Sequence, residues 1–224
     1  MSRVIVVTSG KGGVGKSSIS VNLASALAYS KFKVCLIDGD FGLKNLDVMM
    51  GLENRVVYDL NDVVEGRCTI EQVLVKDKRI AGLSLLPSCK SLSFENLDTK
   101  IMNSLIERLS KDFDFIIVDS PAGVEKGFEY SASLASEAIV VVNLDVSSLR
   151  DADRVVGLLM KKGINTINMI INKVNVDDIP IATVPEKSVN DAISIAIIAI
   201  DKEGINIFNP NFSAFKVANV SSNC

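Results

Sequence analysis

Histidine is absent from the 224-residue sequence. Its absence excludes a Ser-His-Asp triad, a zinc site built on histidine and an imidazole general base. Cysteine is scarce, and its four residues form no C-x-x-C pair: Cys35, Cys68, Cys89 and Cys224. This spacing predicts neither a metal-binding cysteine framework nor a set of disulfides, and it favours a reducing cytosol as the compartment.

Long hydrophobic runs are also missing. No stretch approaches the ~18 apolar residues that a transmembrane helix needs, and the apolar segment 195–200 is so short that we expect it in a core. No signal peptide is expected, because the short apolar run after Arg3 leads directly into a glycine-rich loop.

An excess of positive charge is absent as well. The formal net charge is −3, and the isoelectric point is about 5.1. These values argue against a broad electrostatic grip on nucleic acid, although they are compatible with a local basic patch. No nucleic-acid partner is therefore expected.

Length and hydropathy predict one large domain over residues 1–224. Hydrophobic residues make up 48% of the chain and charged residues 23%, and the mean hydropathy of +0.32 is on the apolar side for a soluble protein. Long strands of a parallel sheet, covered on both faces, account for such a composition.

The sequence does have a glycine-rich loop near its N-terminus. Residues 10–17 read GKGGVGKS and fit the phosphate-binding pattern G-x-x-x-x-G-K-[ST] at every fixed position. A strand expected at residues 4–7 and a helix expected at residues 18–29 supply the context that this loop needs. Glycines let the backbone curl so that N–H groups point at phosphate oxygens, and the following helix adds the positive end of its dipole.

Two side chains of this loop have predicted roles of their own. We expect Lys16 to reach the outer phosphates and Ser17 to offer its hydroxyl to Mg²⁺. The predicted nucleotide-binding residues of the loop are Gly10, Lys11, Gly12, Gly13, Val14, Gly15, Lys16, Ser17 and Ser18.

Carboxylates follow two further expected strands. Asp38 and Asp40 come after a strand at residues 33–37, and Asp119 comes after an apolar strand at residues 113–118. Ligands of open parallel sheets bind beyond the carboxyl ends of the strands, so these acids are expected beside the phosphates. A hydrophobic strand that closes with aspartate is the Walker B arrangement, which places a carboxylate at Mg²⁺. The alternative is that Asp38 and Asp40 serve only the turn and Asp119 only the strand end.

A second lysine in the loop, Lys11, indicates a particular class of phosphate-binding loop. KGGVGKS resembles the deviant Walker A loop of the MinD/ParA family of ATPases. The resemblance implies that Lys11 crosses a dimer interface to the partner's nucleotide, while Lys16 acts on the nucleotide of its own chain. It also implies that Asp40 orients the water that attacks the γ-phosphate and that Asp38, Asp119 and Ser17 serve the magnesium site. Lys11, Lys16 and Asp40 are then the catalytic residues.

Later motifs resemble the MinD branch of this family: GLKNLD at residues 42–47, GLENRVVYDL at 51–60 and DSPAG at 119–123. ParA-type partition ATPases and FlhG-like flagellar-number ATPases share the early motifs but differ across residues 55–59. In the family, an asparagine at the position of Asn172 contacts adenine, which its two-faced amide suits. The sequence VPE at residues 184–186 resembles the loop that closes over the base, which adds Pro185 to the expected site.

The stretch ahead of the next expected helix has two interpretations. Ser147 or Ser148 is expected as its N-cap, with Asp151 in the first turn. The same stretch resembles the MinD segment that precedes the partner-docking helix, which makes Arg150, Asp151 and Asp153 interface candidates.

The alternation of strands and helices predicts a three-layer α/β P-loop NTPase fold with a mostly parallel central sheet and helices on both faces. The resemblance implies a Mg·ATP-dependent, homodimerising ATPase that recruits a MinC-type inhibitor to the membrane and is released when a MinE-type or equivalent regulator stimulates hydrolysis. Such a protein is cytoplasmic, and when ATP-bound it is peripheral on the inner face of the cell membrane. The alternatives are FlhG-like or ParA-type activity, an iron–sulfur carrier, which would need paired cysteines, and a nucleotide-sensing scaffold that does not hydrolyse ATP.

Two features depart from the family pattern. Only twelve residues separate Asn172 from Pro185, where relatives place a loop, a short helix and a strand, so the segment is expected to be either deleted or incompletely represented. Residues 217–224, VANVSSNC, lack the basic and bulky apolar faces of a membrane-binding helix. A truncation before that helix is the expectation.

Overall fold

A computed structural model of the chain describes residues 2–40, 45–88, 99–175, 193–201 and 204–208. Within these residues the centre of the molecule is a nine-stranded sheet, in the order β3-β4-β2-β5-β1-β6-β7-β8-β9. The strands are β1 (Arg3–Thr8), β2 (Val34–Asp38), β3 (Val75–Lys76), β4 (Leu83–Leu86), β5 (Phe115–Asp119), β6 (Glu137–Asn143), β7 (Thr166–Asn175), β8 (Ile193–Asp201) and β9 (Gly204–Phe208).

Helices connect most of these strands. They are α1 (Lys16–Tyr29), α2 (Leu46–Met49), the 3₁₀ helix η1 (Glu53–Arg55), α3 (Leu60–Val64), α4 (Ile70–Val73), α5 (Thr99–Leu109), α6 (Lys126–Ser133) and α7 (Val146–Lys161). In the described part of the chain, no helix is both long enough and apolar enough to cross a membrane.

The sheet is mostly parallel, as predicted. Strands β4, β2, β5, β1, β6, β7 and β8 pair in parallel, whereas β3 and β9 are antiparallel at the two ends of the sheet. Parallel neighbours end at the same edge, and Asp38 at the end of β2 is the register partner of Asp119 at the end of β5. The strand pairing alone therefore brings these two carboxylates together.

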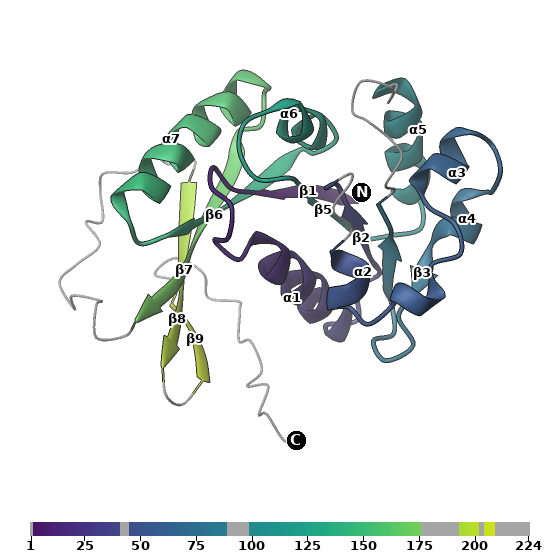
Figure 1. Cartoon of the computed structure of the whole chain (residues 1–224), viewed down its shortest axis with the longest axis horizontal. Coiled ribbons are helices and arrows are strands. Elements are labelled where there is room, and N and C mark those ends of the chain that lie inside the picture. Colours follow the sequence, from purple (N-terminus) through teal and green to yellow (C-terminus); the bar gives the residue numbers. More distant parts are fainter. Residues whose placement is uncertain (1, 41–44, 89–98, 176–192, 202–203, 209–224) are drawn as a thin grey trace.

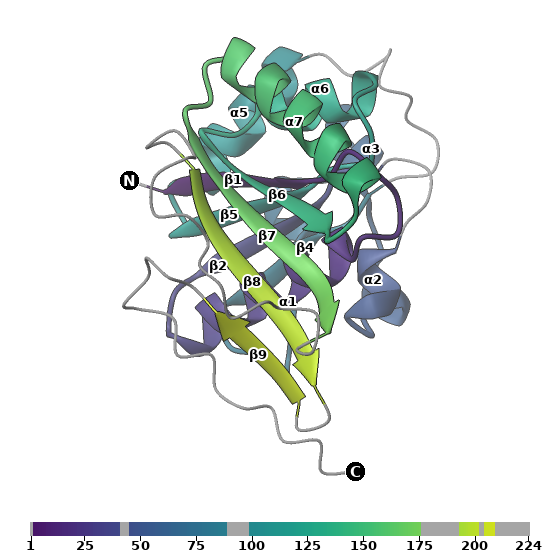
Figure 2. The ribbon, with the colours of Figure 1, turned by 90° about the vertical axis from the view of Figure 1, so that its left-hand side faces the viewer.

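Helices cover both faces of the sheet, which confirms the three-layer prediction (Figure 1). Alternate residues of a strand face opposite sides, and the core follows this period: Ile5 and Val7 pack in a cluster with α1, whereas Val4 and Val6 pack in clusters with α5, α6 and α7. Figure 2 shows α7 across one face of the twisted sheet and α1 on the other. A chain with both faces of its sheet covered needs apolar residues throughout its strands, and this explains the hydropathy.

The start of α7 differs from the prediction. The cap is Asp145, whose carboxylate accepts a hydrogen bond from Ser148 N at 2.8 Å, so the expectation of Ser147 or Ser148 as the N-cap is wrong. Asp145 has an extended backbone, with φ −135° and ψ 149°, from which an aspartate reaches the N–H three residues on. Ser148 instead uses its hydroxyl to accept from Asn143 N at 3.0 Å.

At the end formed by β7, β8 and β9, the sheet extends further than predicted. Strand β7 was expected at residues 166–171 but continues to Asn175, because β8 pairs with it in parallel as far as Ile200. The apolar segment 195–200 lies in β8. Pro185 and the VPE motif at residues 184–186 lie outside the described residues, as does most of the span between Asn172 and Pro185.

Candidate nucleotide-binding site

The glycine-rich loop lies where the order of the sheet reverses. It joins β1 to α1, and β1 is flanked by β5 on one side and by β6 on the other. In an open α/β sheet the crevice beyond the carboxyl ends of such strands is where ligands bind. The loop therefore occupies the position that the topology prepares for a ligand.

Two glycines of the motif have steric reasons to be glycine. A Cβ on Gly10 would lie 2.5 Å from Asp151 Cβ and 2.7 Å from its backbone carbon. Gly15 has a φ of 95°, and a Cβ there would lie 2.3 Å from Asn172 Nδ2. A side chain at Gly10 would push the loop away from α7, whereas at Gly15 it would be strained by the positive φ and would displace the Asn172 amide.

The N-terminus of α1 is left open at the loop. Among the described residues no side chain caps this helix end, and its first turn carries no acidic residue. The positive end of the helix dipole and the first N–H groups of α1 are thus directed at the space enclosed by the loop. This arrangement fits an anionic phosphate group.

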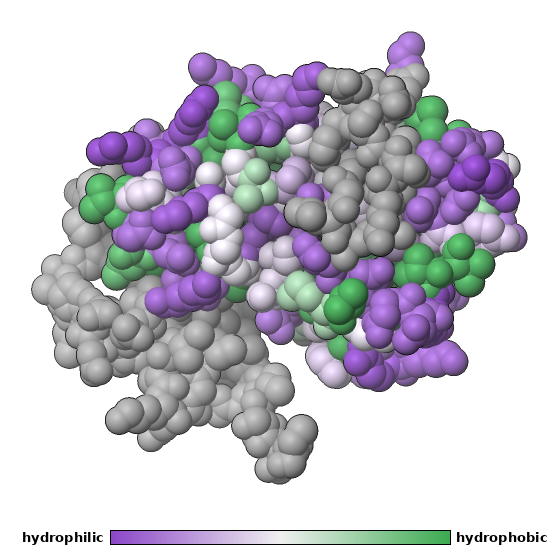
Figure 3. All heavy atoms as spheres, viewed as in Figure 1, coloured by the Kyte–Doolittle hydropathy of each residue, from purple (hydrophilic) through white to green (hydrophobic). Residues whose placement is uncertain are grey.

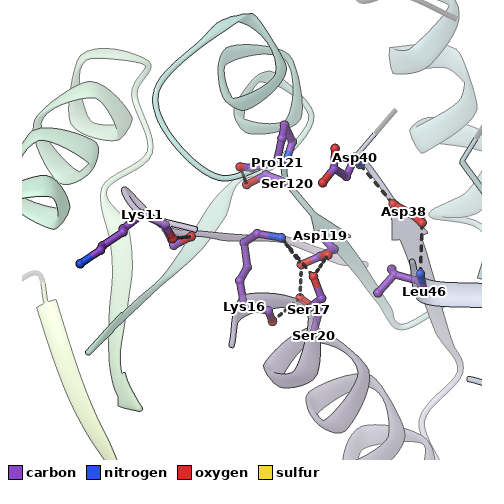
Figure 4. Close-up of polar contacts among 11 residues, drawn as sticks. Lys11, Lys16, Ser17, Ser20, Asp38, Asp40, Leu46, Asp119, Ser120 and Pro121 are labelled. Atoms are coloured by element: carbon purple, nitrogen blue, oxygen red, sulfur yellow. Dashed lines mark hydrogen bonds and ion pairs between the residues drawn. The ribbon is translucent and has the colours of Figure 1, made fainter. Parts of the chain in front are cut away.

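Lys16, Ser17 and Asp119 come together as predicted (Figure 4). Lys16 Nζ lies 3.0 Å from Asp119 Oδ1, in an ion pair whose two side chains are both buried. The Ser17 hydroxyl donates to Asp119 Oδ2 at 2.7 Å. Asp119 therefore orients both the lysine and the serine of the loop.

Ser20 is a member of this cluster that the sequence analysis missed. Its hydroxyl lies 2.7 Å from Asp119 Oδ1 and 3.1 Å from the carbonyl oxygen of Lys16. The available signal was its spacing, because residues four apart lie on the same face of a helix and Lys16 already faced the site.

The cluster suits magnesium. Ser17 Oγ and Asp119 bring oxygen atoms together, and Mg²⁺ prefers one or two protein oxygens together with water and substrate phosphates. The described residues contain no group of three or more His, Cys, Asp or Glu side chains placed to hold a metal by themselves. A site that holds magnesium jointly with a phosphate group is consistent with both observations.

Asp38 lies behind this cluster, buried at the end of β2. It accepts hydrogen bonds from Asp40 N at 3.1 Å and from Leu46 N at 3.3 Å. Burial raises the pKa of Asp38 to about 6, and the nearby Asp119 charge adds to this rise while the N–H donors oppose it. The Asp38 carboxylate thus connects the first residue of α2 to the end of β2, where Asp38 and Asp119 are neighbours.

Asp40 is half-buried and lies two residues beyond the end of β2. Burial raises the pKa of its carboxyl, the Lys16 charge lowers it and Asp119 raises it. Ser88 donates its hydroxyl to the Asp40 carbonyl oxygen at 3.1 Å, which anchors the backbone of this residue. The charges of Lys16 and Asp119 thus act on the Asp40 carboxyl, and its role in orienting water stays a prediction.

Because Asp38 is buried, we expect Asp38→Asn to become more stable relative to wild type as the pH rises, in protein free of magnesium and nucleotide. A carboxyl with a raised folded-state pKa stabilises the fold below its ordinary pKa, and this contribution is lost as the pH rises through about 6. We expect the variant's free energy of unfolding to improve relative to wild type by about 2 kcal/mol between about pH 4.5 and about pH 8. Denaturant unfolding across this range measures it, and a difference that does not change with pH would refute the assignment.

The two lysines of the loop point in opposite directions. Figure 4 shows Lys16 directed at Asp119 and Lys11 directed away from both. The Lys11 side chain is 48% exposed, and its Nζ lies 3.9 Å from Asp145 Oδ1. Ser9 donates its hydroxyl to the Lys11 carbonyl oxygen at 3.0 Å, so the backbone of Lys11 is held while its ammonium group faces outward.

The remaining predicted residues lie on β7, α1 and α7. Asn172 is buried and donates through Nδ2 to the Val14 carbonyl oxygen at 2.8 Å, so it contacts the loop, and its role toward adenine stays a prediction. Ser18 is exposed on α1, and Arg150 and Asp153 are exposed on α7. Asp151 packs against Gly10.

A Walker A loop whose lysine and serine face a strand-end aspartate, on a mostly parallel sheet with helices on both faces, defines a P-loop nucleoside triphosphatase. Comparison with known proteins shows which family of P-loop nucleoside triphosphatases the chain belongs to. The AAA domain family matches residues 2–177. The septum site-determining protein MinD of Synechocystis is 45% identical over 201 residues, which cover 89% of this chain and 76% of that protein.

Solved structures of MinD proteins are also similar to this chain in sequence and fold. The MinC:MinD cell division protein complex of Aquifex aeolicus is 48% identical with a TM-score of 0.72, over 79% of this chain and 70% of that chain. MinD of Pyrococcus horikoshii in complex with Mg-ADP is 29% identical with a TM-score of 0.71, over 90% of this chain and 82% of that chain. The chain belongs to the MinD family of septum site-determining proteins, and it is a P-loop ATPase.

Proposed function

We propose that this chain is a Mg·ATP-dependent ATPase that forms a homodimer around two nucleotides and helps to place the division site. In this proposal the dimer holds a MinC-type inhibitor at the membrane surface, and a MinE-type or equivalent regulator ends the state by stimulating hydrolysis. The observation that carries the proposal is the divergence of the two loop lysines. Lys16 is buried in its own site, whereas Lys11 presents its charge at the surface beside that site.

The residues around Lys11 support a protein interface there. Leu144, Val146 and Leu149 are exposed hydrophobic residues that flank Asp145, whose carboxylate lies 3.9 Å from Lys11 Nζ. Figure 3 shows hydrophobic patches interrupting an otherwise hydrophilic face near α7. Apolar side chains grouped around an outward lysine suit a surface that becomes buried when a partner binds.

The site residues divide the catalytic work as follows. Lys16 and the loop N–H groups bind the phosphates of ATP, and Ser17 and Asp119 hold Mg²⁺, which supplies charge neutralisation at the phosphates. Asp40 orients the attacking water, and Asn172 and Pro185 contact the base. Because the sequence has no histidine, orientation by a carboxylate replaces imidazole chemistry, and phosphoryl transfer depends mainly on such positioning and charge stabilisation.

The partner part of the proposal rests on the relatives and on the surface of α7. An Aquifex aeolicus relative forms a complex with MinC. In this chain Arg150 and Asp153 are exposed on α7 together with Leu149, which combines charge with an apolar contact. We assign a MinC-type partner to this region.

Lys11→Ala is expected to prevent the ATP-dependent dimer while leaving nucleotide binding to the monomer within about threefold of wild type, because Lys11 points out of its own site. Light scattering in ATP and in ADP measures the mass, and calorimetry measures the affinity. Lys78→Ala, which removes an exposed lysine far from the loop, is the control and should dimerise normally. A Lys11→Ala dimer as stable as that of wild type would disprove the trans-acting role.

A further inference from the structure

Two consecutive residues of β7 reach the nucleotide loop. Asn172 Nδ2 donates to the Val14 carbonyl oxygen at 2.8 Å, and Lys173 Nζ donates to the Gly13 carbonyl oxygen at 2.7 Å. In a regular strand, successive side chains point to opposite faces, so only one of two neighbours could reach the loop. The strand must therefore deviate from regular geometry at this point.

The deviation is visible in the backbone. Lys173 has a φ of 58°, in the left-handed region, and the pairing of β7 with β8 shifts register between Ile171 and Val174. A bulge of this kind re-aims a side chain and bends the strand. A lysine in this conformation costs free energy that glycine would avoid, so the strain here accompanies a specific placement of the side chain.

The two hydrogen bonds fix the direction of the loop's N–H groups. In a planar trans peptide the C=O and the following N–H point in opposite directions. Holding the carbonyls of Gly13 and Val14 toward β7 therefore aims the N–H groups of Val14 and Gly15 away from β7. These N–H groups are then free to bind a phosphate.

We propose that Lys173 is a positioning residue for nucleotide binding, acting with Asn172 as a strap that sets the phosphate-binding N–H groups of the loop before the nucleotide arrives. This inference rests on the proposed function, because it assumes that the loop binds a nucleotide. Lys173 supplies a charged donor from an exposed position, whereas Asn172 holds the next carbonyl from a buried one. Because the strap also contains the predicted base-contacting Asn172, it links recognition of the base to the shape of the phosphate site.

Lys173→Met tests the strap, since it keeps an unbranched stem and removes the donor. We expect ADP affinity to fall about tenfold, and the backbone order of Val14 and Gly15 in nucleotide-free protein, measured as NMR order parameters, to fall as well. Lys173→Arg, which keeps a charged donor, should recover most of both properties. The control is Lys31→Met, because Lys31 is an exposed lysine that also has a positive φ, of 72°, and lies at the end of α1 away from the loop.

Calorimetry with Mg-ADP and NMR relaxation of the loop give independent readouts. Affinity and backbone order in Lys173→Met that match those of Lys31→Met would overturn the proposal, and so would a less ordered loop without weaker binding. If wild type failed to bind ADP, the proposed function would fail, and the comparison of backbone order alone would then decide whether Lys173 shapes the loop.

Discussion

Lys16→Met is expected to abolish nucleotide binding and to lower the free energy of unfolding by about 3 kcal/mol. The Lys16 and Asp119 side chains are only 9% and 2% exposed, with 3.0 Å between Nζ and Oδ1, and removing one partner of a buried pair leaves an uncompensated charge. The cost should lie at the low end of the usual range, because the hydroxyls of Ser17 and Ser20 still contact Asp119. Denaturant unfolding and ATP calorimetry measure the two effects.

A double variant separates stability from binding. Lys16→Met combined with Asp119→Asn removes both charges, so most of the lost stability should return. ATP binding should not return, because the phosphate-binding lysine and the magnesium carboxylate are both gone. Recovery of binding in the double variant, or wild-type affinity in Lys16→Met, would contradict the assigned roles.

Asp40→Ala is expected to keep ATP affinity within about threefold of wild type and to lower turnover by about 10²- to 10⁴-fold, the range for a positioned group that handles the attacking water. Asp40 makes no direct bond to Lys16, Ser17 or Asp119 in the described structure, but the charges of Lys16 and Asp119 act on its carboxyl. Its removal therefore spares the phosphate-binding contacts. Phosphate release and ATP calorimetry on the same preparation separate the two quantities.

The matched control is Asp112→Ala, which removes an exposed carboxylate just before β5, at the opposite end of that strand from Asp119. It should leave both turnover and affinity unchanged. Hydrolysis by Asp40→Ala at the wild-type rate would remove Asp40 from the mechanism.

Much of this site could be predicted because local pattern and sheet topology agree. The spacing of Gly10, Gly15, Lys16 and Ser17 defines the loop without knowledge of the tertiary structure. Asp119 could be placed beside it because parallel neighbours end at one edge of a sheet, and β1 pairs with β5. Lys16 and Ser17 contact Asp119 at 3.0 and 2.7 Å, while their roles toward phosphate and magnesium stay predictions.

The residues that were missed depend on geometry that no local pattern encodes. Lys173 reaches Gly13 only because β7 departs from regular pairing near it, and an apolar strand gives no warning of a bulge. Asp145 caps α7 in place of Ser147 or Ser148 because β6 continues to Asn143 and sets where the helix can begin. The apolar segment 195–200 could not be assigned a structure from its sequence, since short apolar runs fit buried helices and strands equally.

The most direct test of the central claim is capture of a MinC-family protein by this chain carrying Asp40→Ala, in ATP and in ADP, with the oligomeric mass recorded on the same samples. We expect capture in ATP by a species of twice the monomer mass, and no capture in ADP by the monomer. A dimer that ignores the MinC-family protein, or equal capture by the monomer in both nucleotides, would contradict it.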